Sequence, residues 1–141
     1  MSGTDQSLRI AAALLTDERH RLLLVRKHGT TAFMQPGGKI DPGEQPLDAV
    51  LRELREELGL VVGRETPLFQ GRFVAPAANE PGFTVEADIF ALALSTEPRA
   101  AAEIAEIAWL EPGLPPAITL APLTRDHILP LWQSMASEAP A

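Results

Sequence analysis

Apolar runs separated by short polar turns open the chain. Residues from Leu8 to Leu15 are mostly apolar, residues 17–20 are polar, and a second apolar run follows from Leu22 to Arg26. This order predicts two strands joined by a hairpin. Three alanines within Ile10–Leu15 leave a helix open as the competing interpretation of that segment.

A second pair of strands is predicted at Pro67–Val74 and Phe83–Leu94, on either side of a loop at residues 75–82. The loop contains several turn-forming residues: Pro76, Asn79, Pro81 and Gly82. The second strand begins with alternating polar and apolar residues and ends fully apolar. We therefore expect a strand that enters from solvent and then runs through a core covered on both faces.

A helix is predicted between these pairs, with an apolar stripe at helical spacing formed by Leu47, Val50, Leu51, Leu54 and Leu58. Pro46 fits the first helical position and Gly59 fits the left-handed position after the last turn. Gln45 is a weak N-cap, and Glu44 places negative charge beside the positive end of the helix dipole.

The last third of the chain is less regular. Residues Glu103–Leu110 fit either a short helix or a strand. Thr124 can cap a C-terminal helix whose apolar positions are Ile128, Leu131, Trp132 and Met135. Pro130 is expected to kink this helix. We expect Trp132 to pack the helix on the sheet.

Three carboxylates share one face of the predicted central helix, on the side opposite its apolar stripe. Glu53, Glu56 and Glu57 are spaced i, i+3 and i+4 and follow a glycine turn that ends in Lys39. Such a cluster repels itself unless cations bind it, and hard cations such as Mg²⁺ prefer oxygen ligands. A lysine beside the turn can add a point charge to a phosphate oxygen.

The stretch from Gly38 to Leu60 resembles the signature of the Nudix hydrolases: glycine, five residues, Glu, seven residues, then Arg-Glu-apolar-any-Glu-Glu-any-Gly-apolar. Every fixed position matches, with Gly38, Glu44, Arg52, Glu53, Leu54, Glu56, Glu57, Gly59 and Leu60. The resemblance implies one Nudix domain over residues 1–141, an α/β/α sandwich with a mixed β-sheet.

The resemblance also implies roles for the matching residues. Glu53, Glu56 and Glu57 would hold Mg²⁺, or Mn²⁺ as a substitute, with a carbonyl of the glycine turn at Gly37. Arg52 would orient the glutamates, and Glu44 would support the loop or the metal shell. Lys39 matches a lysine that often contacts phosphate. The resemblance favours a strand at Ile107–Leu110 and makes Glu103 or Glu106, besides Glu53, a candidate base or extra ligand.

The predicted activity is Mg²⁺-dependent hydrolysis of a diphosphate bond in a nucleoside diphosphate linked to another group. ADP-ribose or nucleotide-sugar substrates are weakly favoured, because Pro76 stands where ADP-ribose-type members carry a proline. Alternatives are a house-cleaning (d)NTP pyrophosphohydrolase like MutT and a non-catalytic nucleotide-sensing module. An isopentenyl-diphosphate isomerase is disfavoured because the chain has no cysteine.

Substrate recognition is predicted from residues outside the signature. Arg26 and Lys27 end the second predicted strand, and Arg26 is the preferred substrate-binding residue of the two. Phe73 and Phe83 could stack on a base and Asn79 could bind a base or sugar, although core packing and a turn are the simpler interpretations. Nudix members that cleave dinucleoside polyphosphates often carry a tyrosine soon after the signature, so the resemblance argues against such substrates for this chain, which has no tyrosine.

Composition narrows the partners. The chain has 141 residues and a formal charge of −7, which argues against a nucleic-acid or membrane-surface binder and leaves a small molecule as the partner. It has no run of membrane-spanning length and no signal-peptide pattern, so the expected location is cytoplasmic. A homodimer is possible. With no thiol and with His20, His28 and His127 scattered, no second catalytic constellation competes.

Overall fold

A computed structural model describes residues 6–138. The strands are β1 (Ser7–Thr16), β2 (Leu22–Lys27), β3 (Gly37–Lys39), β4 (Leu68–Pro76), β5 (Thr84–Ala93) and β6 (Ile104–Leu110). The helices are α1 (Pro46–Leu58) and α2 (Leu129–Glu138), and a π-helical segment, Thr124–Ile128, leads into α2. None of the helices within the described residues is long and apolar enough to cross a membrane.

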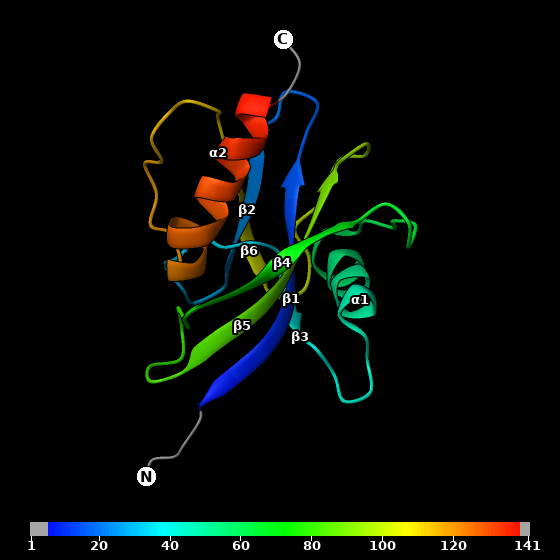
Figure 1. Cartoon of the computed structure of the whole chain (residues 1–141), viewed down its shortest axis with the longest axis vertical. Coiled ribbons are helices and arrows are strands. Elements are labelled where there is room, and N and C mark those ends of the chain that lie inside the picture. The colour runs from blue at the N-terminus through cyan, green and yellow to red at the C-terminus, as the bar shows by residue number, and fades with distance from the viewer. Residues whose placement is uncertain (1–5, 139–141) are drawn as a thin grey trace.

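The strands form one mixed sheet in the order β4-β5-β1-β2-β6 (Figure 1). β1 runs parallel to β5, whereas the other pairs are antiparallel. β1 pairs with β2 only at the hairpin, where Thr16 faces Leu22, and its middle pairs with the short strand β3, where Ala11 faces Gly38. This division places the glycine turn beside the centre of the sheet.

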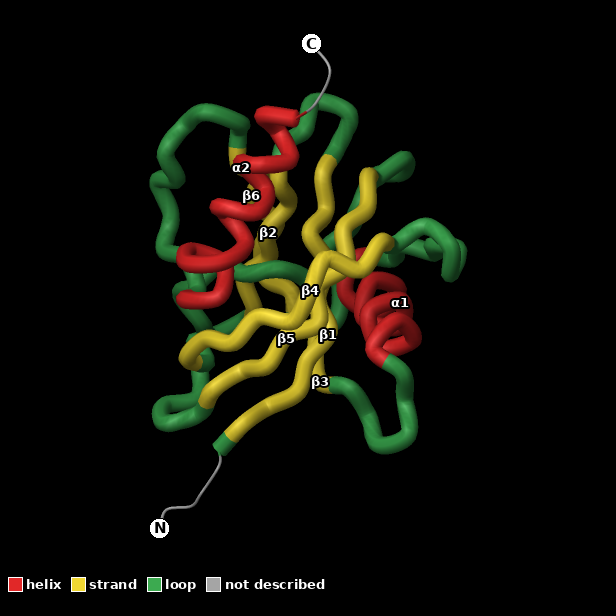
Figure 2. The backbone as a smooth tube through the Cα atoms, in the orientation of Figure 1, coloured by secondary structure: helices red, strands yellow, loops and turns green. Residues whose placement is uncertain are grey.

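Helical segments cover both faces of the sheet, with α1 on one side and α2 on the other (Figure 2). Alternate residues of β1 supply both cores: Ala11, Ala13 and Leu15 belong to the core under α1, and Ala12 and Leu14 to the core under α2. The predicted α/β/α sandwich is confirmed. The helical interpretation of Ile10–Leu15 is wrong, because alternation in a strand lets small and large apolar residues fill two cores at once.

The predicted strands are confirmed with small shifts at their ends. β4 runs two residues further than expected, to Pro76, which an edge strand tolerates because one side of its backbone needs no partner. β5 is buried on both faces from Ala87 to Phe90, as its apolar second half predicts. Residues Ile104–Leu110 form a strand, which excludes the helical alternative.

Helix α1 begins and ends where the sequence predicts. Gln45 makes no side-chain cap bond. At the other end Gly59 adopts a left-handed conformation with φ 67°, which favours glycine. Its N–H donates to the Arg55 carbonyl at 3.1 Å, and the Leu60 N–H donates to the Leu54 carbonyl at 3.2 Å. These bonds satisfy carbonyls that the helix end leaves free.

The prediction that Thr124 caps the C-terminal helix is wrong. Thr124 lies inside the helical segment and is fully buried. The Leu129 N–H donates to the Thr124 carbonyl, five residues back, so the backbone widens into a π turn just before Pro130. That widening accommodates a ring which would otherwise clash with the preceding turn. Trp132 packs against the sheet as expected, and its Nε1–H donates to the His20 carbonyl at 3.0 Å.

Candidate active site

The glycine turn lies directly against both β1 and α1. A Cβ atom at Gly38 would come within 2.5 Å of a Glu53 carboxylate oxygen, and one at Gly37 within 2.3 Å of the Ala11 carbonyl oxygen. Both distances are shorter than any real contact. Gly37 must therefore be glycine for β3 to pair with β1, whereas a side chain at Gly38 would displace the Glu53 carboxylate.

Glu57 and Glu53 form a nearly buried acidic pair beneath this turn. Glu57 is 3% exposed, and its Oε1 accepts a hydrogen bond from the Gly37 N–H at 3.1 Å. The Glu53 side chain is 14% exposed. Burial and, after it, the negative charge of Glu53 raise the pKa of Glu57 to about 8, against the opposing effects of the Gly37 hydrogen bond and the Lys27 charge. The pair therefore retains a proton unless a cation compensates it.

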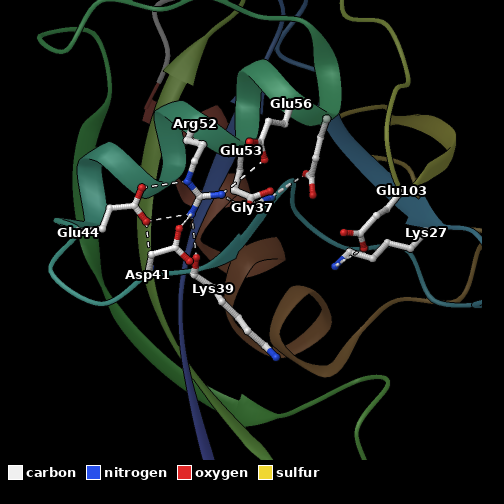
Figure 3. Close-up of polar contacts among 10 residues, drawn as sticks. Lys27, Gly37, Lys39, Asp41, Glu44, Arg52, Glu53, Glu56 and Glu103 are labelled. Carbon is white, nitrogen blue, oxygen red and sulfur yellow. Dashed lines mark hydrogen bonds and ion pairs between the residues drawn. The ribbon is translucent and has the colours of Figure 1, made fainter.

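Arg52 connects the acidic residues of the signature (Figure 3). Its Nε and Nη2 donate to the two carboxylate oxygens of Glu44, both at 2.9 Å. Its Nη1 donates to Glu53 at 2.8 Å and, more weakly, to Glu56 at 3.5 Å. Nη2 also donates to the Lys39 carbonyl at 3.1 Å. One guanidinium thus holds α1, the loop before it and the end of β3 together.

Glu44 is fixed from both sides. Besides its bidentate contact with Arg52, its Oε1 accepts the Asp41 N–H at 2.9 Å. The hydrogen bonds from Arg52, followed by that of Asp41, lower the pKa of Glu44 to about 2. Glu44 therefore stays ionised and anchors the loop between β3 and α1.

The segment before β6 joins the site by docking on the end of α1. The Ala101 N–H donates to the Glu57 carbonyl at 2.9 Å, and the Arg99 N–H donates to the Leu58 carbonyl at 3.0 Å. These bonds satisfy terminal helix carbonyls and carry Glu103 to the glycine turn. There Glu103 forms an ion pair with Lys27 at 3.7 Å.

A cleft of about 380 Å³ opens between these elements. It is lined by Lys27, Gly37, Gly38, Lys39, Asp41, Arg52, Glu53, Glu57, Glu80 and Glu103. The lining combines carboxylates with three cationic side chains. Such a surface can bind metal ions through its acids and phosphate oxygens through its lysines.

Not every predicted site residue lies in the cleft. Glu56 is 51% exposed and does not line it, although Arg52 reaches it. Lys39 lines the cleft, but its side chain extends away from the glutamates in Figure 3. Arg26 lies outside, where it pairs with Glu106 at 3.1 Å and donates to the Thr30 carbonyl at 2.9 Å.

The carboxylates do not form a preformed metal cage. Among the described residues, no group of three His, Cys, Asp or Glu side chains is arranged to hold a metal ion by itself. The predicted acidic face of α1 is not open along its whole length, because β3 covers the part that contains Glu57. What the structure offers is the buried pair Glu53 and Glu57.

Two lining residues, Asp41 and Glu80, were not predicted from the sequence. Each lies in a loop, Asp41 between β3 and α1 and Glu80 between β4 and β5, where no periodicity indicates which way a side chain points. The sequence also favoured Arg26 over Lys27 as the substrate-binding residue, and the structure shows the opposite arrangement. Successive residues of a strand point to opposite faces, so only one of the two can face the cleft, and that is Lys27.

A larger surface hollow, of about 450 Å³, lies elsewhere, next to the end of β1. Asp17, Arg21 and Trp109 are among its lining residues, and the Arg21 guanidinium lies 5.0 Å from the Trp109 ring. Asp17 is already compensated by hydrogen bonds from Arg21 and the backbone. Volume alone would favour this hollow, but of the two it is the smaller cleft that contains two carboxylates held together at a nearly buried position.

Comparison with curated proteins finds similarity over about a third of the chain. An "8-oxo-dGTP diphosphatase" of Escherichia coli (strain K12) is 37% identical over 59 residues, which cover 39% of this chain and 46% of that protein. An "RNA pyrophosphohydrolase" of Marinomonas sp. (strain MWYL1) is 45% identical over 47 residues, covering 33% and 29%. The matches thus span less than half the length of these relatives.

Solved structures share the whole fold. The MutT protein of Methanosarcina mazei Go1 superposes with a TM-score of 0.76 at 22% identity, covering 97% of this chain and all of that one. A bifunctional NMN adenylyltransferase/ADP ribose pyrophosphatase of Francisella tularensis, complexed with AMP and a Mn ion, gives 0.67 at 16% identity, covering 94% and 43%. The family profile of the NUDIX domain matches residues 7–131. The resemblance noted in the sequence is confirmed, and the chain belongs to the NUDIX family.

Proposed function

We propose that this chain is a divalent-metal-dependent hydrolase that cleaves a diphosphate bond of a nucleotide. The observation that carries the proposal is the nearly buried pair Glu53 and Glu57 at the glycine turn. Burying two carboxylates together costs free energy unless a cation or proton compensates them. Their place in a cleft with Lys27 and Lys39 favours a site for a cation and phosphates.

The residues present fit Mg²⁺ or Mn²⁺. Mg²⁺ is commonly held by one or two carboxylates together with substrate phosphates, so a buried pair suffices without a complete cage. Glu53 and Glu57 would hold the ion, and Glu56 would join them on release from its long contact with Arg52. The chemistry such an ion supplies is neutralisation of phosphate charge and acidification of water.

The chain's own residues divide the remaining tasks. Lys27 and Lys39 would place positive charge beside the phosphates, and Arg52 would hold Glu53 in a fixed orientation. Glu103 is the preferred general base over Glu106, because it lines the cleft while Glu106 pairs with Arg26 outside it. Its ion pair with Lys27 would hold the carboxylate in place at the cleft.

For the substrate, the names of the sequence relatives favour the (d)NTP pyrophosphohydrolase alternative. Both names, "8-oxo-dGTP diphosphatase" and "RNA pyrophosphohydrolase", describe hydrolysis at a diphosphate or pyrophosphate group. The ADP-ribose alternative has the single proline Pro76 and a structural neighbour at 16% identity in its support. A non-catalytic nucleotide sensor is the least favoured, because every signature glutamate is present.

The test of the activity is Glu57→Gln, with Glu65→Gln in the loop after α1 as the matched control. Hydrolysis of a panel of nucleoside triphosphates, nucleotide sugars and ADP-ribose would be followed by chromatography with Mg²⁺ or Mn²⁺. We expect Glu57→Gln to lower kcat by at least about 100-fold while the control retains it. An unchanged rate in excess Mg²⁺ would contradict the proposal. Release of nucleoside monophosphate and pyrophosphate would identify the triphosphate activity.

A further inference from the structure

One buried amide on the opposite side of the sheet lacks a partner. Gln35 is 5% exposed, and its Oε1 accepts a hydrogen bond from the Thr124 hydroxyl at 2.8 Å. Its Nε2 is also buried and has no hydrogen-bond partner among the described residues. A buried donor left unpaired costs free energy, so such a group in a folded protein calls for an explanation.

Gln35 lines a small apolar hollow of about 70 Å³. Its other lining residues are Ile10, Ala12, Met34, Pro76, Ala78, Val85, Ala121, Leu123 and Thr124. The hollow is far smaller than a typical ligand pocket. It has room for the edge of a flat ring, or for about two water molecules at roughly 30 Å³ each. Gln35 and Thr124 are the two polar side chains among the lining residues.

The hollow and the acidic cleft are lined by one continuous segment. Met34 and Gln35 line the hollow, and Gly37, Gly38 and Lys39 line the cleft. Gln35 and Gly38 are three residues apart, so their Cα atoms are separated by at most about 10 Å. Lys39 pairs with Ile10, which lines the hollow. A molecule with its phosphates in the cleft can therefore reach the hollow across β3.

We infer that Gln35 selects the base of the nucleotide by donating a hydrogen bond from Nε2 to a ring carbonyl oxygen at the hollow. This inference rests on the proposed nucleotide substrate. Thr124 acts as a positioning residue, because its hydroxyl donates to Oε1 and leaves Nε2 as the free donor. A base with an amino group at that edge would place donor against donor. The site thus prefers guanine and uracil to adenine and cytosine.

Binding of nucleoside monophosphates, measured by calorimetry, tests the inference without requiring turnover. We expect wild-type protein to bind GMP about tenfold more tightly than AMP, and UMP more tightly than CMP. Gln35→Met keeps the length of the side chain but removes its donors, so each preference should fall to within about twofold. Thr124→Val frees the amide to rotate and should also reduce the preferences.

Arg125→Ala serves as the control, since Arg125 neighbours Thr124 but its side chain pairs with Asp126. It should retain the wild-type preference, and thermal unfolding would show that each variant folds. An equal preference in Gln35→Met and wild type, or a wild-type preference for AMP and CMP, would overturn the inference. Nucleotide hydrolysis measured in parallel separates the two proposals, because hydrolysis without base preference contradicts only the role of Gln35.

Discussion

The two faces of the sheet bury similar apolar side chains but very different polar ones. Under α1 the buried polar groups are charged: Glu57 and Glu53 lie beneath the glycine turn, and Arg52 holds Glu53. Under α2 they are neutral: the Thr124 hydroxyl donates to the Gln35 Oε1, and the Trp132 indole donates to a backbone carbonyl. β1 supplies alternate residues to both cores.

This difference separates stability from chemistry. Burial of neutral, hydrogen-bonded groups among apolar side chains stabilises a fold, whereas a buried acid pair destabilises it until a cation arrives. The α2 face therefore stabilises a sheet whose other face holds like charges together. Substitutions on the two faces should then have opposite signatures, with stability lost on one and activity lost on the other.

The largest expected effect is on the α2 face. Trp132→Ala removes a nearly buried indole and its hydrogen bond to the His20 carbonyl. We expect the free energy of unfolding to fall by about 3–5 kcal/mol, as for other large-to-small core substitutions. Urea unfolding followed by circular dichroism measures the change.

Leu114→Ala is the control for this substitution, because Leu114 is a large apolar residue that is exposed. It should change stability by less than about 0.5 kcal/mol. At a temperature where Trp132→Ala remains folded, its kcat should stay near that of wild type. A loss of kcat in the folded variant would show that the α2 face contributes to hydrolysis as well as to stability.

The next effect is on the α1 face. Arg52→Ala releases Glu44, Glu53 and Glu56 from one guanidinium. We expect activity and apparent metal affinity to fall about 10–100-fold, because residues that orient metal ligands have effects of this size. Arg55→Ala, on the same helix, should leave both unchanged. Metal titrations of the hydrolysis rate that coincide for Arg52→Ala and wild type would contradict the orienting role.

Local patterns were sufficient to predict the elements that hold the site. Helix α1 was predicted with correct ends because Pro46, Gly59 and the apolar stripe are signals within one helix. Four strands followed from apolar runs, with errors of one or two residues at their ends, and β6 begins three residues before the predicted strand Ile107–Leu110. β3 was predicted only as a glycine turn, because Gly37–Lys39 contains no apolar run. The signature identified Arg52 and the glutamates, since their spacing on one helix is itself local.

The remaining features depend on contacts between distant segments. The burial of Glu57 arises because β3 packs over α1, and no helical periodicity contains that information. A threonine before a run of apolar helical positions is typical of an N-cap. The π turn before Pro130 instead places Thr124 inside the helix and against Gln35. Glu103 reaches the cleft because backbone bonds dock its segment on the end of α1.

The charged pair should also make stability depend on pH. The folded pKa of Glu57 is about 8, above its ordinary value of 4.5, so between these values the unfolded chain is ionised while the folded protein retains the proton. Metal-free wild-type protein should therefore lose stability as pH rises from about 4.5 to 8. Glu57→Gln should abolish this loss and be more stable at pH 8, by on the order of 1–2 kcal/mol.

Thermal unfolding in a chelator at several pH values measures this dependence, and Glu65→Gln should reproduce the wild-type slope. Added Mg²⁺ should reduce the slope, because a bound cation replaces the proton. Parallel curves for Glu57→Gln and wild type would mean that the acid pair is not the source of the pH dependence.

The smallest expected effect concerns Pro130 on the α2 face. It tests whether the helix accommodates this proline without strain. In a regular helix Pro130 would cost about 3 kcal/mol, because its ring clashes with the preceding turn and it lacks an N–H. Here the π turn relieves the clash, and the buried bond between Thr124 and Gln35 holds that turn in place. Pro130→Ala should therefore change the free energy of unfolding by less than about 1 kcal/mol. Because Pro130 is exposed, its replacement removes no buried packing contacts that could conceal a gain in stability. An increase in stability of about 3 kcal/mol in urea unfolding would mean that the proline strains the helix, and that the π turn is imposed by it rather than held by the buried amide.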